Sequence, residues 1–119
     1  MSDEFNRFRR PLPQELRLLA ALVTRASAVR LRPDWLETLR VSPIDDGGMG
    51  SLRLATDEAL QQPGRLVGPR VAEVQFTDAD GVPVLASLNL DPDGELMELD
   101  IWKTDFSPLI RIPDDLPAG

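Results

Sequence analysis

The chain has 119 residues, 42% of them hydrophobic and 28% charged, so it is long enough to bury a core and has the composition of a globular domain. Its net charge of -7 opposes binding to nucleic acid and to anionic membranes, and favours a basic partner. Because cysteine is absent, disulfides, thiol nucleophiles and cysteine metal sites are excluded. We expect a single domain over residues 1–119, with flexible ends at 1–10 and 113–119.

The expected location is the cytoplasm. The first residues lack the basic segment and apolar run of a secretory signal, and no apolar stretch approaches the roughly 20 residues that span a bilayer.

One helix is predicted near the start of the chain, from Gln14 to Ala28. Pro13 fits its first turn, and Glu15 is placed favourably near its positive end. Its apolar face consists of Leu16, Leu18, Leu19, Ala20, Leu22 and Val23. We therefore expect this helix to cover one face of a sheet.

The segment from Val29 to Val41 predicts a short turn of helix followed by a strand. A glycine-rich bend follows at residues 44–50, and Ser51 to Ala55 reads as the next strand.

Three strands are predicted in the C-terminal half, at Val71 to Phe76, Val82 to Leu90 and Leu96 to Trp102. Turns at Asp78–Gly81 and Asp91–Gly94 join them into an antiparallel meander. The apolar side chains expected on one face are Ala72, Val74, Phe76, Val82, Val84, Ala86, Leu88, Leu90, Met97, Leu99 and Ile101. The predicted class is α+β: an antiparallel sheet of about four to six strands with the N-terminal helix on one face.

The opposite face of the meander is polar and is the first candidate for partner binding. In simple hairpin register its residues include Glu73, Gln75, Ser87, Asn89, Glu98, Asp100 and Trp102. Carboxylates can receive lysine or arginine from a partner, and Trp102 offers apolar or cation–π contact. The contact set that we predict is Glu73, Gln75, Asn89, Glu98, Asp100 and Trp102. An ordinary solvated sheet face is the alternative.

The loop Asp45–Ser51 is a second candidate surface, through contacts of its backbone with a ligand. A phosphate site is not expected there, because the Gly-Lys-Ser/Thr ending is missing and two aspartates would repel phosphate. The two Asp-x-Asp-Gly turns resemble fragments of calcium loops, but without a terminal glutamate they predict plain turns. We expect no metal and no cofactor.

Catalysis would depend on carboxylates alone, since histidine, cysteine and tyrosine are all absent. Glu98 and Asp100 could form a pair about 6–7 Å apart by strand geometry, but the sequence predicts no pocket around them. We therefore expect a protein that is not an enzyme, with a carboxylate-dependent enzyme or metal binder as an alternative.

The segment Lys103–Leu109 is expected to leave the last strand through a turn. We expect Phe106 and Leu109 to close the edge of the core, while Asp105 and Ser107 hydrogen-bond the turn.

The elements DGGMGSL (46–52), DADGVPV (78–84) and ELDIWKTDFSPL (98–109) together resemble a family of small bacterial domains of unknown function. The resemblance covers most of the chain after the first helix. It implies the fold and a bacterial cytoplasm, and it supplies no catalytic residue.

In size, acidity and fold class the chain is also similar to the immunity proteins of bacterial polymorphic toxins, although no motif carries that similarity. An immunity protein occludes a basic toxin with a preformed acidic surface and needs no cofactor. The predicted function is therefore neutralisation of a cognate toxin by direct binding, by a monomer or weak homodimer. A small housekeeping or regulatory interaction domain is the first alternative.

Overall fold

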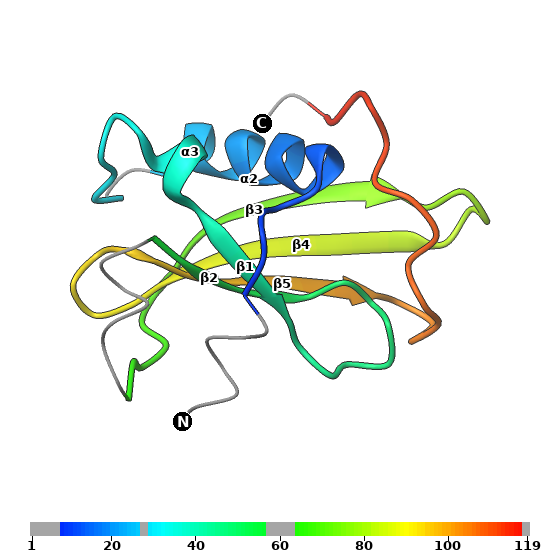
Figure 1. The fold of residues 1–119 in the computed structure, drawn as a ribbon. Helices are drawn as coiled ribbons and strands as arrows, with labels where there is room; N and C mark the ends of the chain where they lie inside the picture. Colours follow the sequence, from blue (N-terminus) through cyan, green and yellow to red (C-terminus); the bar gives the residue numbers. More distant parts are fainter. Residues whose placement is uncertain (1–7, 27–28, 57–63, 118–119) are drawn as a thin grey trace.

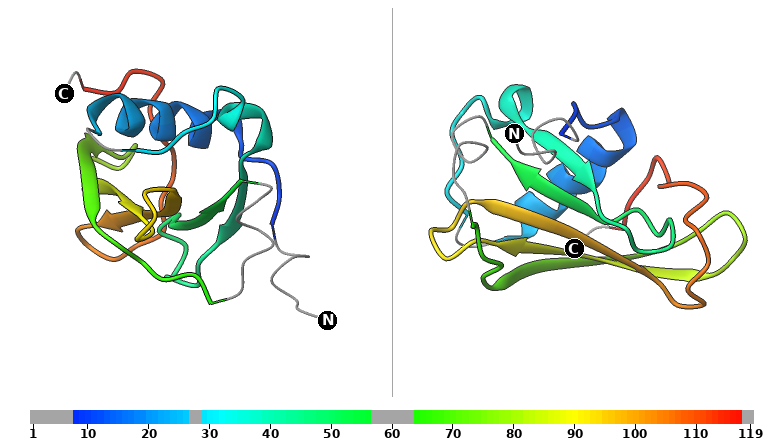
Figure 2. Two further views of the ribbon diagram at one scale, coloured as in Figure 1. Left: turned by 90° about the vertical axis from the view of Figure 1, so that its left-hand side faces the viewer. Right: turned by 60° about the horizontal axis from the view of Figure 1, so that its bottom comes forward.

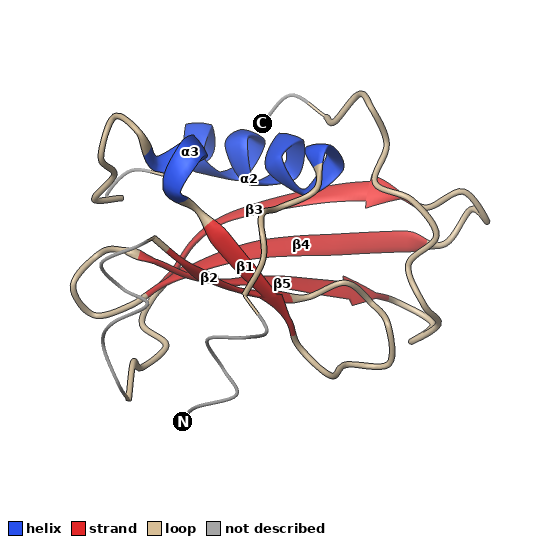
Figure 3. Cartoon of the chain, viewed as in Figure 1, coloured by secondary structure: helices blue, strands red, loops and turns tan. Residues whose placement is uncertain are grey.

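A five-stranded antiparallel sheet with one long helix across one face forms the body of the protein (Figures 1 and 3). The structure, a computed structural model, describes residues 8–26, 29–56 and 64–117. The elements in chain order are α2 (Pro13–Arg25), α3 (Trp35–Thr38), β1 (Arg40–Pro43), β2 (Leu52–Ala55), β3 (Arg70–Thr77), β4 (Pro83–Leu90) and β5 (Leu96–Lys103). The predicted α+β class is confirmed.

The strands lie in the order β1-β2-β5-β4-β3, and all neighbours are antiparallel. Strands β3, β4 and β5 form the predicted meander, and β2 pairs with the free side of β5 (Figure 1). Gly81 and Gly94 complete the two hairpin turns with φ of 83° and 88°, a region in which side chains are strained.

Helix α2 is anchored at its first turn by Glu15, whose Oε1 accepts the Leu12 N–H at 2.7 Å. Leu18, Leu19 and Leu22 are fully buried between α2 and the sheet. The helix ends at Arg25, earlier than the predicted Ala28, because Ala26 has an extended backbone with ψ of 140°. Ala28 lies outside the described residues.

The core fills the space between α2 and the sheet, as the alternation of apolar residues predicted. The strand residues on this face are buried: Leu52, Leu54, Ala72, Val74, Phe76, Val84, Ala86, Leu88, Leu90, Leu99 and Ile101. Met97 departs from the prediction. Because the register shifts between Asn89 and Leu90, Leu96 pairs with Leu90 and enters the core, while Met97 is an extra, half-buried residue of a bulge.

Both ends of the chain make contacts where they are described. Arg9 pairs with the backbone of Val41 on the edge of β1, and its guanidinium lies 2.8 Å from Glu15 Oε1. After β5 the chain runs back toward α2 (Figure 2), where Asp114 bonds Arg17 at 3.0 Å. Residues 1–7 and 118–119, which belong to the ends expected to be flexible, lie outside the described residues.

Candidate functional site

Three segments singled out in the sequence meet at one end of the sheet, on the right in Figure 1. They are the glycine-rich loop between β1 and β2 (44–51), the turn between β3 and β4 (78–82), and the segment after β5 (104–112), which we call the exit segment. The Leu109 N–H donates to Gly48 O at 3.0 Å. A Cβ on Gly50 would lie 3.2 Å from Leu109 Cδ2, so the absence of a side chain allows the loop and the exit segment to approach closely.

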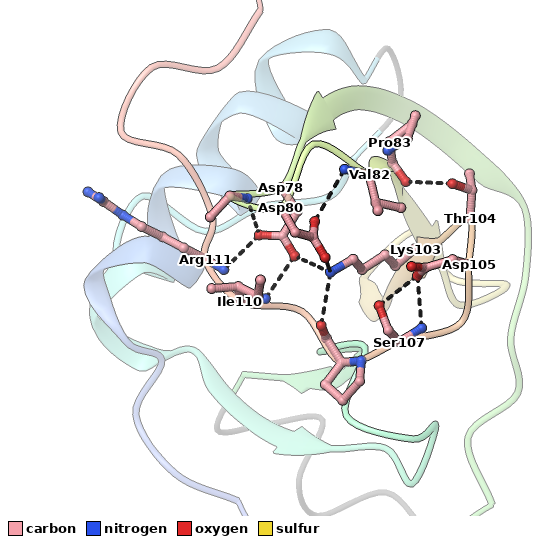
Figure 4. Close-up of polar contacts among 12 residues, drawn as sticks. Asp78, Asp80, Val82, Pro83, Lys103, Thr104, Asp105, Ser107, Ile110 and Arg111 are labelled. Atoms are coloured by element: carbon pink, nitrogen blue, oxygen red, sulfur yellow. Dashed lines mark hydrogen bonds and ion pairs between the residues drawn. The ribbon is translucent and has the colours of Figure 1, made fainter.

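A buried ion-pair cluster joins the β3–β4 turn to the end of β5 and to the segment that follows it (Figure 4). The Lys103 Nζ lies 2.8 Å from Asp78 Oδ2 and 2.6 Å from Asp80 Oδ2, and it donates to Pro108 O at 3.1 Å. Burial alone would lower the pKa of Lys103, but the hydrogen bonds that its ammonium donates to the carboxylates of Asp78 and Asp80 outweigh burial, and the pKa is raised. The ammonium is therefore held charged inside the protein.

Asp78 organises this cluster. Burial alone would raise its pKa, yet the hydrogen bond from Lys103 and the backbone N–H groups of Ile110, Ala79 and Arg111 lower it to about 2. Its Oδ2 accepts the Ile110 N–H at 2.8 Å, and its Oδ1 accepts that of Arg111 at 3.0 Å. These contacts fix the C-terminal segment across the end of the sheet, so the cluster is structural.

The six predicted contact residues all lie on the face of the sheet opposite α2. Register places Asp100 opposite Ser87, which in turn lies opposite Glu73. In the next row Trp102 lies opposite Leu85, and Leu85 opposite Gln75.

The six predicted contact residues differ in the solvent exposure of their side chains. Glu73 and Gln75 are exposed, Glu98 and Asp100 are half-buried, and Trp102 is 43% exposed. Asn89 faces the predicted side, opposite Glu98, but is only 8% exposed. It lies in an interior strand between the longer side chains of Arg70 and Glu98, so it contributes less surface than expected.

Two arginines that the sequence prediction did not include lie among these carboxylates. Arg70 contacts Glu73 at 3.2 Å and Asp100 at 3.7 Å, and Arg53 lies opposite Glu98. Burial and the neighbouring Asp100 raise the pKa of Glu98, while Arg53 opposes that shift. The face therefore carries alternating charges instead of a purely acidic patch.

An aromatic pair stands at the end of this face. The Trp102 and Phe106 ring centroids are 6.2 Å apart, with the planes tilted by 55°. Phe106 was expected to close the core, but this was wrong: its side chain is 68% exposed. Leu109 does pack against the core, as expected.

Phe106 also has an unusual backbone, with φ of 64°, the one positive value at a residue other than glycine in the described part of the chain. The turn is held by Asp105, whose Oδ1 accepts the Ser107 N–H and hydroxyl at 3.0 and 2.6 Å, as predicted. A bulky residue in this region is strained, and such strain is typical of functional positions.

Within the ranges that the structure describes, no three potential ligand side chains gather to hold a metal ion. In those ranges no helix has the length and apolar character to cross a membrane.

The fold and this surface define a small α+β domain with an exposed aromatic pair beside a charged sheet face. The chain belongs to the family described as Domain of unknown function (DUF6984), whose profile matches residues 8–113. This confirms the resemblance to a small domain family of unknown function. No curated protein and no solved structure matches the chain.

Proposed function

We propose that this protein is a non-catalytic binding protein, and specifically an immunity protein that neutralises a basic toxin by direct contact. The proposed contact surface is the outer face of β5 and β3 together with the aromatic pair. It comprises Glu73, Gln75, Glu98, Asp100, Trp102 and Phe106, with Asn89 beneath them.

The observation that carries the proposal is Phe106. An exposed aromatic ring on a backbone with φ of 64° lowers stability twice, through strain and through apolar surface in water. Hydrophobic burial does not account for the residue, because its side chain is 68% exposed. A partner that covers the ring would explain its exposed position, because aromatic side chains often contribute most of the binding energy of protein interfaces.

Charge supports a basic partner. The chain carries a net charge of -7, which accelerates encounter with a positively charged protein. Asp100, on the same face of β5 as Trp102, already forms an ion pair with one guanidinium, that of Arg70 at 3.7 Å. A partner arginine can replace Arg70 there and stack on Trp102, which would couple charge recognition to aromatic contact.

Occlusion needs no catalytic group in the inhibitor. A rigid sheet face laid over the active-site cleft of a toxin excludes its substrate, and the exposed aromatic rings supply most of the binding energy. The cluster around Lys103 holds the exit segment that carries Phe106, so the surface is formed before binding.

The test is co-expression with the product of the neighbouring gene. Rescue of growth and co-purification of the pair are expected. The double variant Trp102→Ala with Phe106→Ala should lose both. Leu66→Ala is the matched control because Leu66 is also 68% exposed but lies outside the proposed surface.

Other outcomes point elsewhere. Loss of rescue in Asp45→Lys, with the aromatic variant unaffected, would assign binding to the Asp45–Ser51 loop. A neighbouring product that is neither toxic nor bound would overturn the immunity role and leave a regulatory interaction domain.

A further inference from the structure

The two edges of the sheet differ in how they are protected. Strand β1 has four residues, ends in Pro43, and is covered by Arg9, whose N–H and C=O pair with Val41. Strand β3 has eight residues without proline, and no other strand of the described ranges pairs with its outer side. A long edge strand of this kind can accept another strand.

The register identifies the main-chain groups on that outer side. The Asp78 N–H donates to Val82 O. Because hydrogen-bonded pairs alternate along an antiparallel ladder, the backbone N–H and C=O groups of Ala72, Val74 and Phe76 also bond to β4. Glu73 and Gln75 then direct their N–H and C=O groups away from the sheet. The extra residue of the bulge lies between Arg70 and Ala72, which leaves 72–76 as the regular edge.

We propose that β3 pairs antiparallel with β3 of a second copy, about a two-fold axis that passes beside Val74. In that register Val74 meets its own copy, Ala72 faces the second copy's Phe76, and Glu73 faces the second copy's Gln75. The small alanine accommodates the large phenylalanine on the core side, and no two carboxylates face each other directly. The strand is thus self-complementary, as a two-fold interface requires.

Neighbouring registers are less favourable. A shift of two residues in one direction sets Glu73 against the second copy's Glu73, where like charges repel. A shift in the other direction places Ala72 opposite the buried Asp78, which is already bonded to Lys103 and the exit segment. Val74 at the axis is therefore the preferred register.

The dimer would form one continuous sheet with both α2 helices on one side and both outer faces on the other. About four main-chain hydrogen bonds would join the copies, and the charge of -7 on each would oppose them, so the association is weak. This dimer does not depend on the proposed function, and its test needs no toxin.

Sedimentation equilibrium of the full chain is the measurement, over a range of protein concentration. We expect a reversible monomer–dimer equilibrium. Gln75→Pro removes an outward N–H and should weaken the dimer by about tenfold or more. Gln75→Ala keeps that N–H and should dimerise like the natural chain.

Two variants that place opposite charges at Gln75 test the register without a proline substitution. Gln75→Glu sets two carboxylates against each other and should weaken the dimer, whereas Gln75→Lys faces Glu73 and should strengthen it. A natural chain that stays monomeric at about millimolar concentration, equal weakening by Gln75→Ala and Gln75→Pro, or the same shift in both charge variants would overturn the proposal.

Discussion

The Nζ of Lys103 lies 2.8 Å from Oδ2 of Asp78, in a position where neither side chain is more than 1% exposed. The pair joins the last strand to the turn between β3 and β4. Asp78 also accepts the N–H groups of Ile110 and Arg111 from the segment after β5, so one carboxylate holds three segments together. Removing either partner leaves a charge in the interior with fewer partners.

Replacing Asp78 with alanine should lower the free energy of unfolding by about 3 kcal/mol, because Lys103 loses a buried partner and three backbone N–H groups lose their acceptor. Asp80→Ala is the matched control. The Asp80 side chain is 35% exposed and leaves Lys103 paired with Asp78, so we expect a loss of about 1 kcal/mol. Urea unfolding of the two variants measures the difference, and equal losses would show that Asp78 does not organise the cluster.

Acid should destabilise the protein through Asp78. Its pKa falls from 3.8 in the unfolded chain to about 2 in the folded protein, so the folded state binds the proton less readily. This contribution is fully present above pH 3.8 and is lost as the pH falls toward about 2. The pKa of Asp91 is also lowered, so its contribution to stability is likewise lost as the pH falls. The pKa of Glu98 is raised, so protonation of Glu98 stabilises the folded state instead, and this happens at higher pH. Urea unfolding at a series of pH values should show a shallower acid slope in Asp78→Asn than in the natural chain.

The sheet was predictable because local rules determined it. Alternating apolar residues and the Asp–Gly turns define β3, β4 and β5, and period-two geometry assigns Glu98 and Asp100 to one face and Leu99 and Ile101 to the other. Pairing of β2 with β5 is a contact between segments far apart in sequence, which no local pattern specifies.

The parts that escaped prediction depend on tertiary contacts. The alternation of β5 continues past Ile101 and places Lys103 on the core side. A buried lysine can be explained only when its carboxylate partners are known, and the sequence does not show that Asp78 and Asp80 lie beside it. Asn89 is buried because β4 is an interior strand, with β5 on one side and β3 on the other. Phe106 was assigned to the core by its hydrophobicity, but the turn held by Asp105 directs it outward.

Gly50→Ala should destabilise the end of the sheet more than Gly47→Ala. Both glycines have positive φ, 100° and 79°, so alanine costs about 1–2 kcal/mol of strain at either position. A Cβ on Gly50 also meets Leu109 at 3.2 Å and Ile101 at 3.4 Å, whereas one on Gly47 meets nothing within 4 Å. We expect a further loss of about 1 kcal/mol at Gly50. Thermal unfolding checks this order, and the reverse order would contradict the packing of the loop on the exit segment.

The double variant Glu98→Lys with Asp100→Lys tests charge on the proposed surface. The fold should persist with a loss of about 1 kcal/mol, because the new lysines lie near Arg53 and Arg70 on a partly solvated face. Binding to a basic partner should weaken strongly. Circular dichroism checks the fold and calorimetry the affinity, and unchanged affinity in a folded variant would remove this face from the proposal.

Phe106 allows stability and binding to be separated. Phe106→Gly removes both the ring and the backbone strain, whereas Phe106→Ala removes the ring and keeps the strain at φ of 64°. The glycine variant should therefore be more stable than the alanine variant by about 1 kcal/mol. Both should bind the partner equally weakly, because both lose the ring that contacts Trp102. Urea unfolding gives the first comparison and calorimetry the second. If either variant bound as tightly as the natural chain, the strain at Phe106 would need a structural explanation, and the partner surface would have to lie elsewhere.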